Sequence, residues 1–221
     1  DMGGTDQTFG FSTAMRTATE AIDKLHTTAE SHHRVMVLEL MGRDAGWIAL
    51  AAGISGGADV ILIPEIPFDL PPVMQRFRAR AKRGSYFSIM AIAEGACPKG
   101  GLQQFKIPAH GLHIPRLGGI AQQVADQIHE KAGVESRCTV LGHLQRGGTP
   151  TPFDRWLATR YGAAAVRLAA AGEHGLMVNL RGRHIGSMPL DEALAQTPKL
   201  VDPAGELVTT ARGLGIVFGD E

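Results

Sequence analysis

The residues best suited to chemistry lie in one stretch, Arg137–Arg155, with the sequence RCTVLGHLQRGGTPTPFDR. This stretch predicts a short apolar strand, Cys138–Leu141, followed by a glycine-rich turn and a helix. Arg137, His143 and Arg146 place cationic or ionisable groups around the turn. Such a junction directs backbone N–H groups and a positive helix end at one spot, so it can hold a phosphate. A second interpretation stays open on spacing alone, since surface arginines also flank ordinary Gly-Gly-Thr-Pro turns.

The composition is that of a packed protein with balanced positive and negative charges. The chain has 221 residues, 44% of them hydrophobic, which is enough for one large domain. Lys+Arg and Asp+Glu balance at 22 each, which argues against nucleic acid and membrane partners and makes any anion site local. No stretch reads as a signal peptide or a membrane span. Cys97 and Cys138 match no metal or redox motif, which favours a reducing cytoplasm.

The elements that must position the glycine-rich turn alternate between strand and helix. The predicted strands are Val35–Leu40, Val60–Ile63, Phe87–Ala93, Cys138–Leu141 and Leu176–Leu180. The predicted helices are Phe11–Ala29, Trp47–Ile54, Pro71–Lys82, Gly118–Lys131, Phe153–Ala171, Asp191–Ala195 and Leu207–Leu214. Gly95–Leu117 is expected to be a loop, and Trp47 and Phe153 are expected in the core. Because the strands are continuously apolar, we predict an α/β fold: a doubly wound, mainly parallel sheet with helices on both faces.

Polar groups follow the first four predicted strands, where parallel sheets bind their ligands. They are Met41-Gly42-Arg43, Pro64-Glu65, Glu94, and Gly142-His143-Leu144-Gln145-Arg146. We therefore expect cations and a carboxylate to converge on one edge of the sheet. Three candidate residues, taken singly, have a structural alternative to a functional role: Glu94 as a solvated loop carboxylate, Arg34 as a surface arginine and His143 as a packing histidine.

Three of these segments together carry a resemblance to a known family. Met41-Gly42-Arg43, Ala91-Ile92-Ala93-Glu94 and TVLGHLQRGG (Thr139–Gly148) resemble, in order and placement, the sugar-phosphate half of a 6-phosphofructokinase of the phosphofructokinase A family. The tail from Thr210 to Asp220 also fits, so the resemblance covers nearly the whole chain. The long segment between Glu94 and Arg137 resembles the actinobacterial and pyrophosphate-using branch.

The resemblance implies a glycolytic phosphotransferase that converts fructose 6-phosphate to fructose 1,6-bisphosphate with Mg²⁺ and either ATP or pyrophosphate. It implies that His143 and Arg146 bind the 6-phosphate of the sugar. Arg34 and Arg137 would bind the same phosphate in a neighbouring subunit's pocket, within a homodimer or homotetramer. A phosphate dianion suits such forked, always-charged arginines.

The remaining implied roles concern the sugar and the transferred group. The backbone of Met41 and Gly42 would line the sugar, and Glu94 would accept hydrogen bonds from its hydroxyls. Arg43 would be the catalytic residue that offsets charge on the transferring phosphoryl group. Asp1 resembles the second acid of the family's Thr-Ile-Asp-Asn-Asp loop and would help to hold the metal.

The resemblance also implies that this chain is a C-terminal fragment, because the family's general base and donor-binding loops would lie upstream of Asp1. We expect residues 1–10 to be a remnant of the catalytic loop, 11–172 the substrate-binding domain, and 173–221 a segment that packs on the missing domain. The sequence departs from the allosteric bacterial members at their lysine-rich effector turn, where it has Arg83-Gly84-Ser85-Tyr86. The alternatives are a non-catalytic sugar-phosphate-binding or regulatory subunit and, more distantly, a dehydrogenase, although Gly56-Gly57 and Gly118-Gly119 lack a dinucleotide fingerprint.

Overall fold

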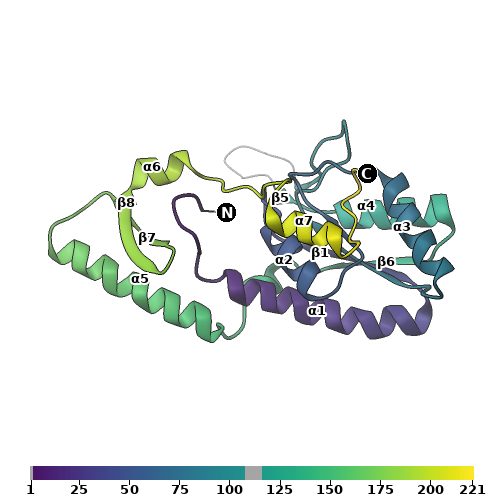
Figure 1. Ribbon diagram of the computed structural model, residues 1–221, viewed down its shortest axis with the longest axis horizontal. Helices are drawn as coiled ribbons and strands as arrows, with labels where there is room; N and C mark the ends of the chain where they lie inside the picture. The colour runs from purple at the N-terminus through teal and green to yellow at the C-terminus, as the bar shows by residue number, and fades with distance from the viewer. Residues whose placement is uncertain (1, 108–115) are drawn as a thin grey trace. The chain divides into compact units, whose positions relative to one another are not determined.

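The computed structural model describes residues 2–107 and 116–221, which form two compact units. The larger unit comprises Met15–Gln145 and Leu200–Glu221, and the smaller comprises the chain up to Ala14 together with Arg146–Lys199. Figure 1 follows the chain through both units. No helix in the described part of the chain is long and apolar enough to cross a membrane.

A four-stranded parallel sheet forms the centre of the larger unit. Its strands, in the order β2-β3-β1-β6, are β2 (Val60–Leu62), β3 (Ser88–Ala93), β1 (Val35–Leu40) and β6 (Ser136–Val140). Every residue of β1, β2 and β3 is buried, as expected for strands covered on both faces. The predicted α/β fold with a parallel sheet is therefore confirmed.

Helices cover both faces of this sheet. Because successive residues of a strand point to opposite faces, each strand contributes side chains to both cores. In β1, Leu38 and Leu40 join a core with α1 (Phe11–His32), α2 (Trp47–Ser55) and α7 (Glu206–Gly213). Val35 and Val37 join the other core, whose helices are α3 (Leu70–Lys82) and α4 (Ile120–Ala132).

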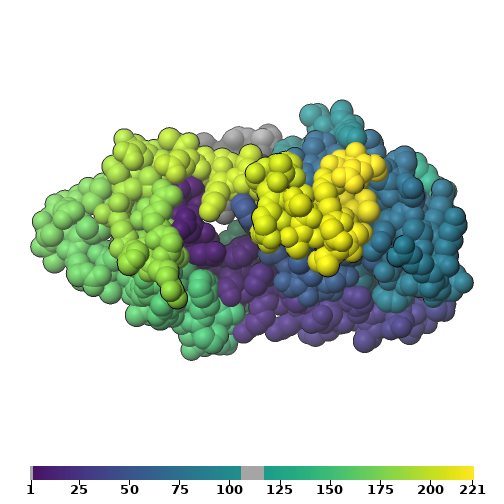
Figure 2. Space-filling model, viewed as in Figure 1, coloured from purple at the N-terminus to yellow at the C-terminus, as the bar shows by residue number. Residues whose placement is uncertain are grey.

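The last residues of the chain belong to the larger unit. Val217 pairs in parallel with Val60 at the edge of β2, and the Asp69 N–H donates to the Gly219 carbonyl. Phe218 between them is fully buried. Figure 2 shows this C-terminal segment, in yellow, against the larger unit. Its expected packing on a further domain stays a prediction.

The smaller unit packs the long helix α5 (Pro152–Ala170) against a hairpin. The hairpin consists of β7 (Leu176–Arg181) and β8 (His184–Pro189), paired antiparallel, and leads into the short helix α6 (Leu190–Ala195). Leu157 and Tyr161 of α5 form its small core with Leu180 of β7. The first residues of the chain join this unit through bonds such as Asn179 Nδ2 to the Gly4 carbonyl, at 2.8 Å.

Some details differ from the sequence-based expectations. The segment expected as a loop contains a short antiparallel pair, β4 (Phe105–Ile107) and β5 (Arg116–Leu117), and β8 was not predicted. The prediction that Phe153 is a core residue is wrong, since its surface is 40% exposed. Trp47 is half-buried and packs against the core, as expected.

Candidate active site at the carboxyl edge of the sheet

The ends of β1 and β3 bring two of the predicted segments together. Leu40 and Ala93 are in register, so the loops that follow them leave the sheet side by side. Glu94 turns its Oε1 toward the first loop and accepts hydrogen bonds from the N–H groups of Gly42, at 3.2 Å, and Arg43, at 3.1 Å. The expected neighbourhood of the Met41–Arg43 loop and a carboxylate is therefore present.

This loop has a tightly determined backbone. A Cβ atom on Gly42 would lie 2.5 Å from the Ala45 carbonyl oxygen, and one on Gly95 would lie 2.1 Å from the Arg43 carbonyl oxygen. Arg43 has a φ of +52°, in the left-handed region that costs a side-chain-bearing residue energy. The surrounding contacts must hold that conformation in place. The Arg43 side chain is exposed and can therefore reach a ligand.

The carboxylate of Glu65, at the end of β2, has a structural task. It accepts hydrogen bonds from the Gly46 N–H, at 2.9 Å, and from the Val201 N–H, at 2.8 Å. Gly46 directly precedes α2, so Glu65 places negative charge at the positive end of that helix. Glu65 thereby ties α2 and the C-terminal segment to the sheet edge.

The glycine-rich turn after β6 is a short 3-10 helix, η1 (Gly142–Arg146). Gly142 has a φ of +53°, which lets the chain leave the strand sharply. His143 and Arg146 are exposed within this helix, as a phosphate site requires. Gln145 between them is only 3% exposed, and its Oε1 accepts a hydrogen bond from the Met41 N–H at 2.9 Å. Sequence reasoning assigned Gln145 no role, because a glutamine between two cations carries no signal of burial.

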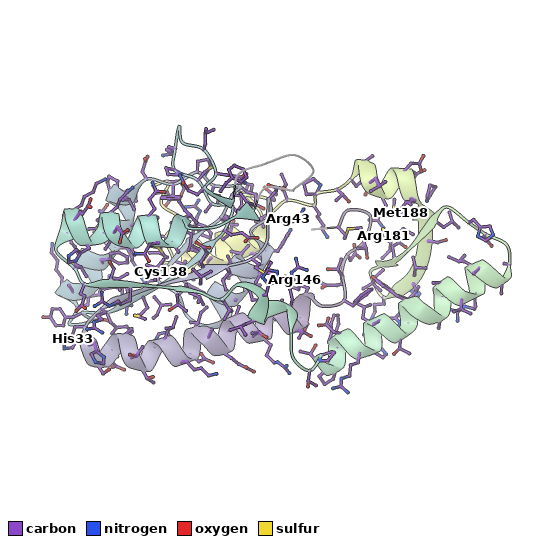
Figure 3. The ribbon with its side chains drawn as sticks, turned by 180° about the vertical axis from the view of Figure 1, so that it is seen from behind. His33, Arg43, Cys138, Arg146, Arg181 and Met188 are labelled. Carbon is purple, nitrogen blue, oxygen red and sulfur yellow. The ribbon has the colours of Figure 1, made fainter. Side chains whose placement is uncertain are left out.

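Arg34 and Arg137 lie at the opposite, amino edge of the sheet. Arg34 immediately precedes β1, about 20 Å along the strand from its carboxyl end, and Arg137 pairs with Met36 near the start of β1. One carboxylate bridges them: Glu135 lies 3.0 Å from Arg34 Nε and 2.7 Å from Arg137 Nη2. Figure 3 shows His33, the neighbour of Arg34, at the far end of this unit from Arg43.

This placement corrects one expectation from the spacing. Arg137 does not share the glycine-rich turn with His143, since the length of β6 separates them. The contact from the Arg34 guanidinium, followed by the charges of Arg34 and Arg137, holds the pKa of Glu135 below its usual value. The role implied for the two arginines in a neighbouring subunit's pocket stays a prediction.

No metal centre is formed by the residues that the structure describes. Within residues 2–107 and 116–221, no group of three or more His, Cys, Asp or Glu side chains could hold an ion. Asp1, the predicted metal ligand, lies outside the described residues.

Cys97 and Cys138 are free thiols. Burial, together with the negative charge of Glu39, raises the pKa of Cys138 to about 11. Glu39 itself is buried in β1 and accepts hydrogen bonds from the N–H groups of Gly119 and Ala121, both at 3.0 Å. It therefore fixes the start of α4 rather than serving the candidate site.

A parallel sheet whose carboxyl edge carries a carboxylate-held loop and a cation-bearing glycine turn defines an α/β protein with a site suited to a phosphorylated polyol. Comparison with known proteins makes the assignment specific. A family model described as phosphofructokinase matches residues 1–169. The chain belongs to the phosphofructokinase family.

The curated relatives include enzymes with two different phosphoryl donors. The chain is 58% identical over 221 residues to the ATP-dependent 6-phosphofructokinase of Chloroflexus aggregans, covering 100% of this chain and 60% of that protein. It is 54% identical to the pyrophosphate–fructose 6-phosphate 1-phosphotransferase of Streptomyces coelicolor, covering 99% of this chain and 62% of that protein. The chain thus spans about three fifths of the length of these relatives.

Solved structures show the same fold. Phosphofructokinase from Saccharomyces cerevisiae superposes with a TM-score of 0.74 at 33% identity, covering 88% of this chain and 24% of that one. The pyrophosphate-dependent phosphofructokinase from Marinobacter aquaeolei superposes with a TM-score of 0.76 at 26% identity, covering 98% of this chain and 54% of that one.

Proposed function

We propose that the full-length protein carrying this chain transfers a phosphoryl group to the 1-hydroxyl of fructose 6-phosphate, giving fructose 1,6-bisphosphate. The observation that carries the proposal is the pair of hydrogen bonds that Glu94 accepts from the backbone N–H groups of Gly42 and Arg43. These hydrogen bonds place the exposed Arg43 next to the Glu94 carboxylate at the edge of the parallel sheet where ligands bind. Family membership supports the same reaction.

Each residue at this edge has a task in the proposal. The exposed His143 and Arg146 of η1 bind the 6-phosphate. Oε1 of Glu94 holds the Met41–Arg43 loop. Oε2, which makes no hydrogen bond within the described residues, accepts hydrogen bonds from the sugar hydroxyls. Arg43 offsets the charge of the phosphoryl group during transfer, a reaction that depends chiefly on positioning and electrostatics.

The proposal includes a phosphoryl donor and an assembly. Both ATP-dependent and pyrophosphate-dependent relatives match this chain, so the donor is one of these two. Mg²⁺ would accompany either donor, but the described residues do not form a site for it. Arg34 and Arg137, paired through Glu135, complete the phosphate site of a neighbouring subunit in a homodimer or homotetramer.

The test is a product assay on the full-length protein. Fructose 6-phosphate is supplied with Mg²⁺ and either ATP or pyrophosphate, and fructose 1,6-bisphosphate is measured by coupling to aldolase. We expect product with at least one donor. Binding of fructose 6-phosphate without product from either donor would instead support the alternative, a non-catalytic sugar-phosphate-binding or regulatory subunit.

A further inference from the structure

Gln145 is a buried polar residue of η1, the proposed phosphate turn, and it joins this turn to the Met41–Arg43 loop. It is 3% exposed, whereas His143 and Arg146 on the same short helix are exposed. Its Oε1 lies 2.9 Å from the Met41 nitrogen, whose N–H donates to it across 104 positions of sequence. A single carboxamide thus connects the turn to which the proposed function assigns the 6-phosphate with the loop that carries Arg43.

The other half of this carboxamide is unpaired. Nε2 of Gln145 is buried and has no hydrogen-bond partner among the described residues. Rotating the amide by 180° does not give Nε2 a partner, because the NH₂ group would then face the Met41 N–H and two donors would oppose each other. A protein that keeps a buried unpaired donor loses stability by it. Since a leucine would fill the same space without that loss, the acceptor oxygen is the part of the side chain that the fold uses.

Two side chains, Gln145 and Glu94, hold the backbone of the Met41–Arg43 loop. Glu94 grips it at the N–H groups of Gly42 and Arg43, and Gln145 grips it one residue earlier, at Met41. At Arg43, the last residue of this anchored stretch, the chain enters the left-handed region with a φ of +52°. A strained residue keeps such a conformation only when its surroundings over-determine it. Without the anchor at Met41, the loop can relax and carry the Arg43 side chain away.

We propose that Gln145 is a positioning residue: it transmits the placement of the phosphate turn to the Met41–Arg43 loop and so aims Arg43 at the transferring group. This inference rests on the proposed function. Gln145 does not touch the substrate in this scheme, since its side chain is buried. Its contribution therefore falls on the chemical step, through Arg43, rather than on binding of the sugar phosphate.

The test compares two substitutions in the full-length protein. Gln145→Leu removes the acceptor, and we expect kcat to fall by about 10- to 100-fold while KM for fructose 6-phosphate changes by less than about 3-fold. Gln145→Glu keeps an acceptor for the Met41 N–H but adds a negative charge beside the phosphate turn. We expect it to retain kcat within about 3-fold while KM for the sugar phosphate rises. The two variants should thus show opposite kinetic patterns.

A second readout does not depend on activity. Hydrogen–deuterium exchange at the Met41 amide should accelerate in Gln145→Leu and stay slow in Gln145→Glu, whatever reaction the protein catalyses. Gln123→Leu on α4, a similar change away from the loop, is the control and should alter neither readout. Failure of the proposed function would appear as absence of product in the wild type, with the exchange pattern intact.

Three outcomes would overturn the inference. Equal loss of kcat in both Gln145 variants would show that the acceptor is not what matters. Unchanged kcat in Gln145→Leu would show that no anchor is needed. A rise in KM alone in Gln145→Leu would make Gln145 a binding residue. If Gln145→Leu fails to fold, the retained kcat and slow exchange of Gln145→Glu still decide.

Discussion

Replacing Glu94 separates two tasks of its carboxylate: the support of the Met41–Arg43 loop, which the structure shows, and the contact with the sugar, which belongs to the proposed function. Oε1 accepts two backbone N–H groups from the Met41–Arg43 loop, and the proposed function gives Oε2 to the sugar. Glu94→Ala removes both oxygens, whereas Glu94→Gln leaves one carbonyl oxygen that can still accept from the loop. The pair therefore tests loop support and sugar recognition independently.

The expected magnitudes come from the burial of the groups concerned. An unpaired buried donor costs about 1–3 kcal/mol, but Gly42 is only half-buried and Arg43 is exposed, so water replaces part of what is lost. We expect Glu94→Ala to lower the free energy of unfolding by about 1–3 kcal/mol in total and Glu94→Gln to lower it by less than about 1 kcal/mol. A hydrogen bond to a charged group contributes about 1.5–3 kcal/mol, so both variants should raise KM for fructose 6-phosphate by roughly 10- to 100-fold.

Urea unfolding of the full-length protein, followed by tryptophan fluorescence, measures the first quantity. Trp47, half-buried five residues from Gly42, is a reporter within the same unit. Steady-state kinetics measures the second. Equal destabilisation by the two variants would refute loop support through Oε1. An unchanged KM in Glu94→Gln would refute the contact with the sugar.

Three further predictions concern other parts of the chain. Arg146→Ala should raise KM for fructose 6-phosphate by about 30-fold or more, equivalent to about 2 kcal/mol, and affect KM for the donor far less; equal effects would contradict a phosphate contact. Glu39→Ala should lower the free energy of unfolding by about 2–4 kcal/mol in denaturant titrations, because the N–H groups of Gly119 and Ala121 lose their buried acceptor, while Glu39→Gln should lower it less. Cys138 has a pKa of about 11 in the folded protein, against 9.0 for an unfolded chain, so at pH 9 its alkylation should be on the order of 50-fold slower in native than in urea-unfolded protein. Because the unfolded chain loses this proton first, the free energy of unfolding should fall as pH rises from 9 to 11. Equal alkylation rates would contradict the burial of Cys138.

The sheet and the edge that carries the site could be predicted because their signals are local. Largely apolar runs without alternation mark β1 and β3 as strands buried on both faces, and parallel pairing brings their carboxyl ends together. The juxtaposition of Glu94 with the Met41–Arg43 loop follows from that geometry. The tasks of Glu65 and Gln145 do not, because each depends on a backbone N–H distant in sequence whose position is set only when the chain has packed.

Arg137 shows most plainly where reasoning from sequence proximity fails. It stands six residues before His143, and a motif read along the chain places both at one turn. A strand, however, advances about 3.3 Å per residue, so residues at its two ends face different edges of the sheet. Arg137 near the start of β6 therefore pairs with Glu135 at the amino edge, where Glu135 also pairs with Arg34, while His143 follows the carboxyl end. One contiguous stretch can thus serve two separate surfaces, which is the arrangement that a phosphate site shared between subunits requires.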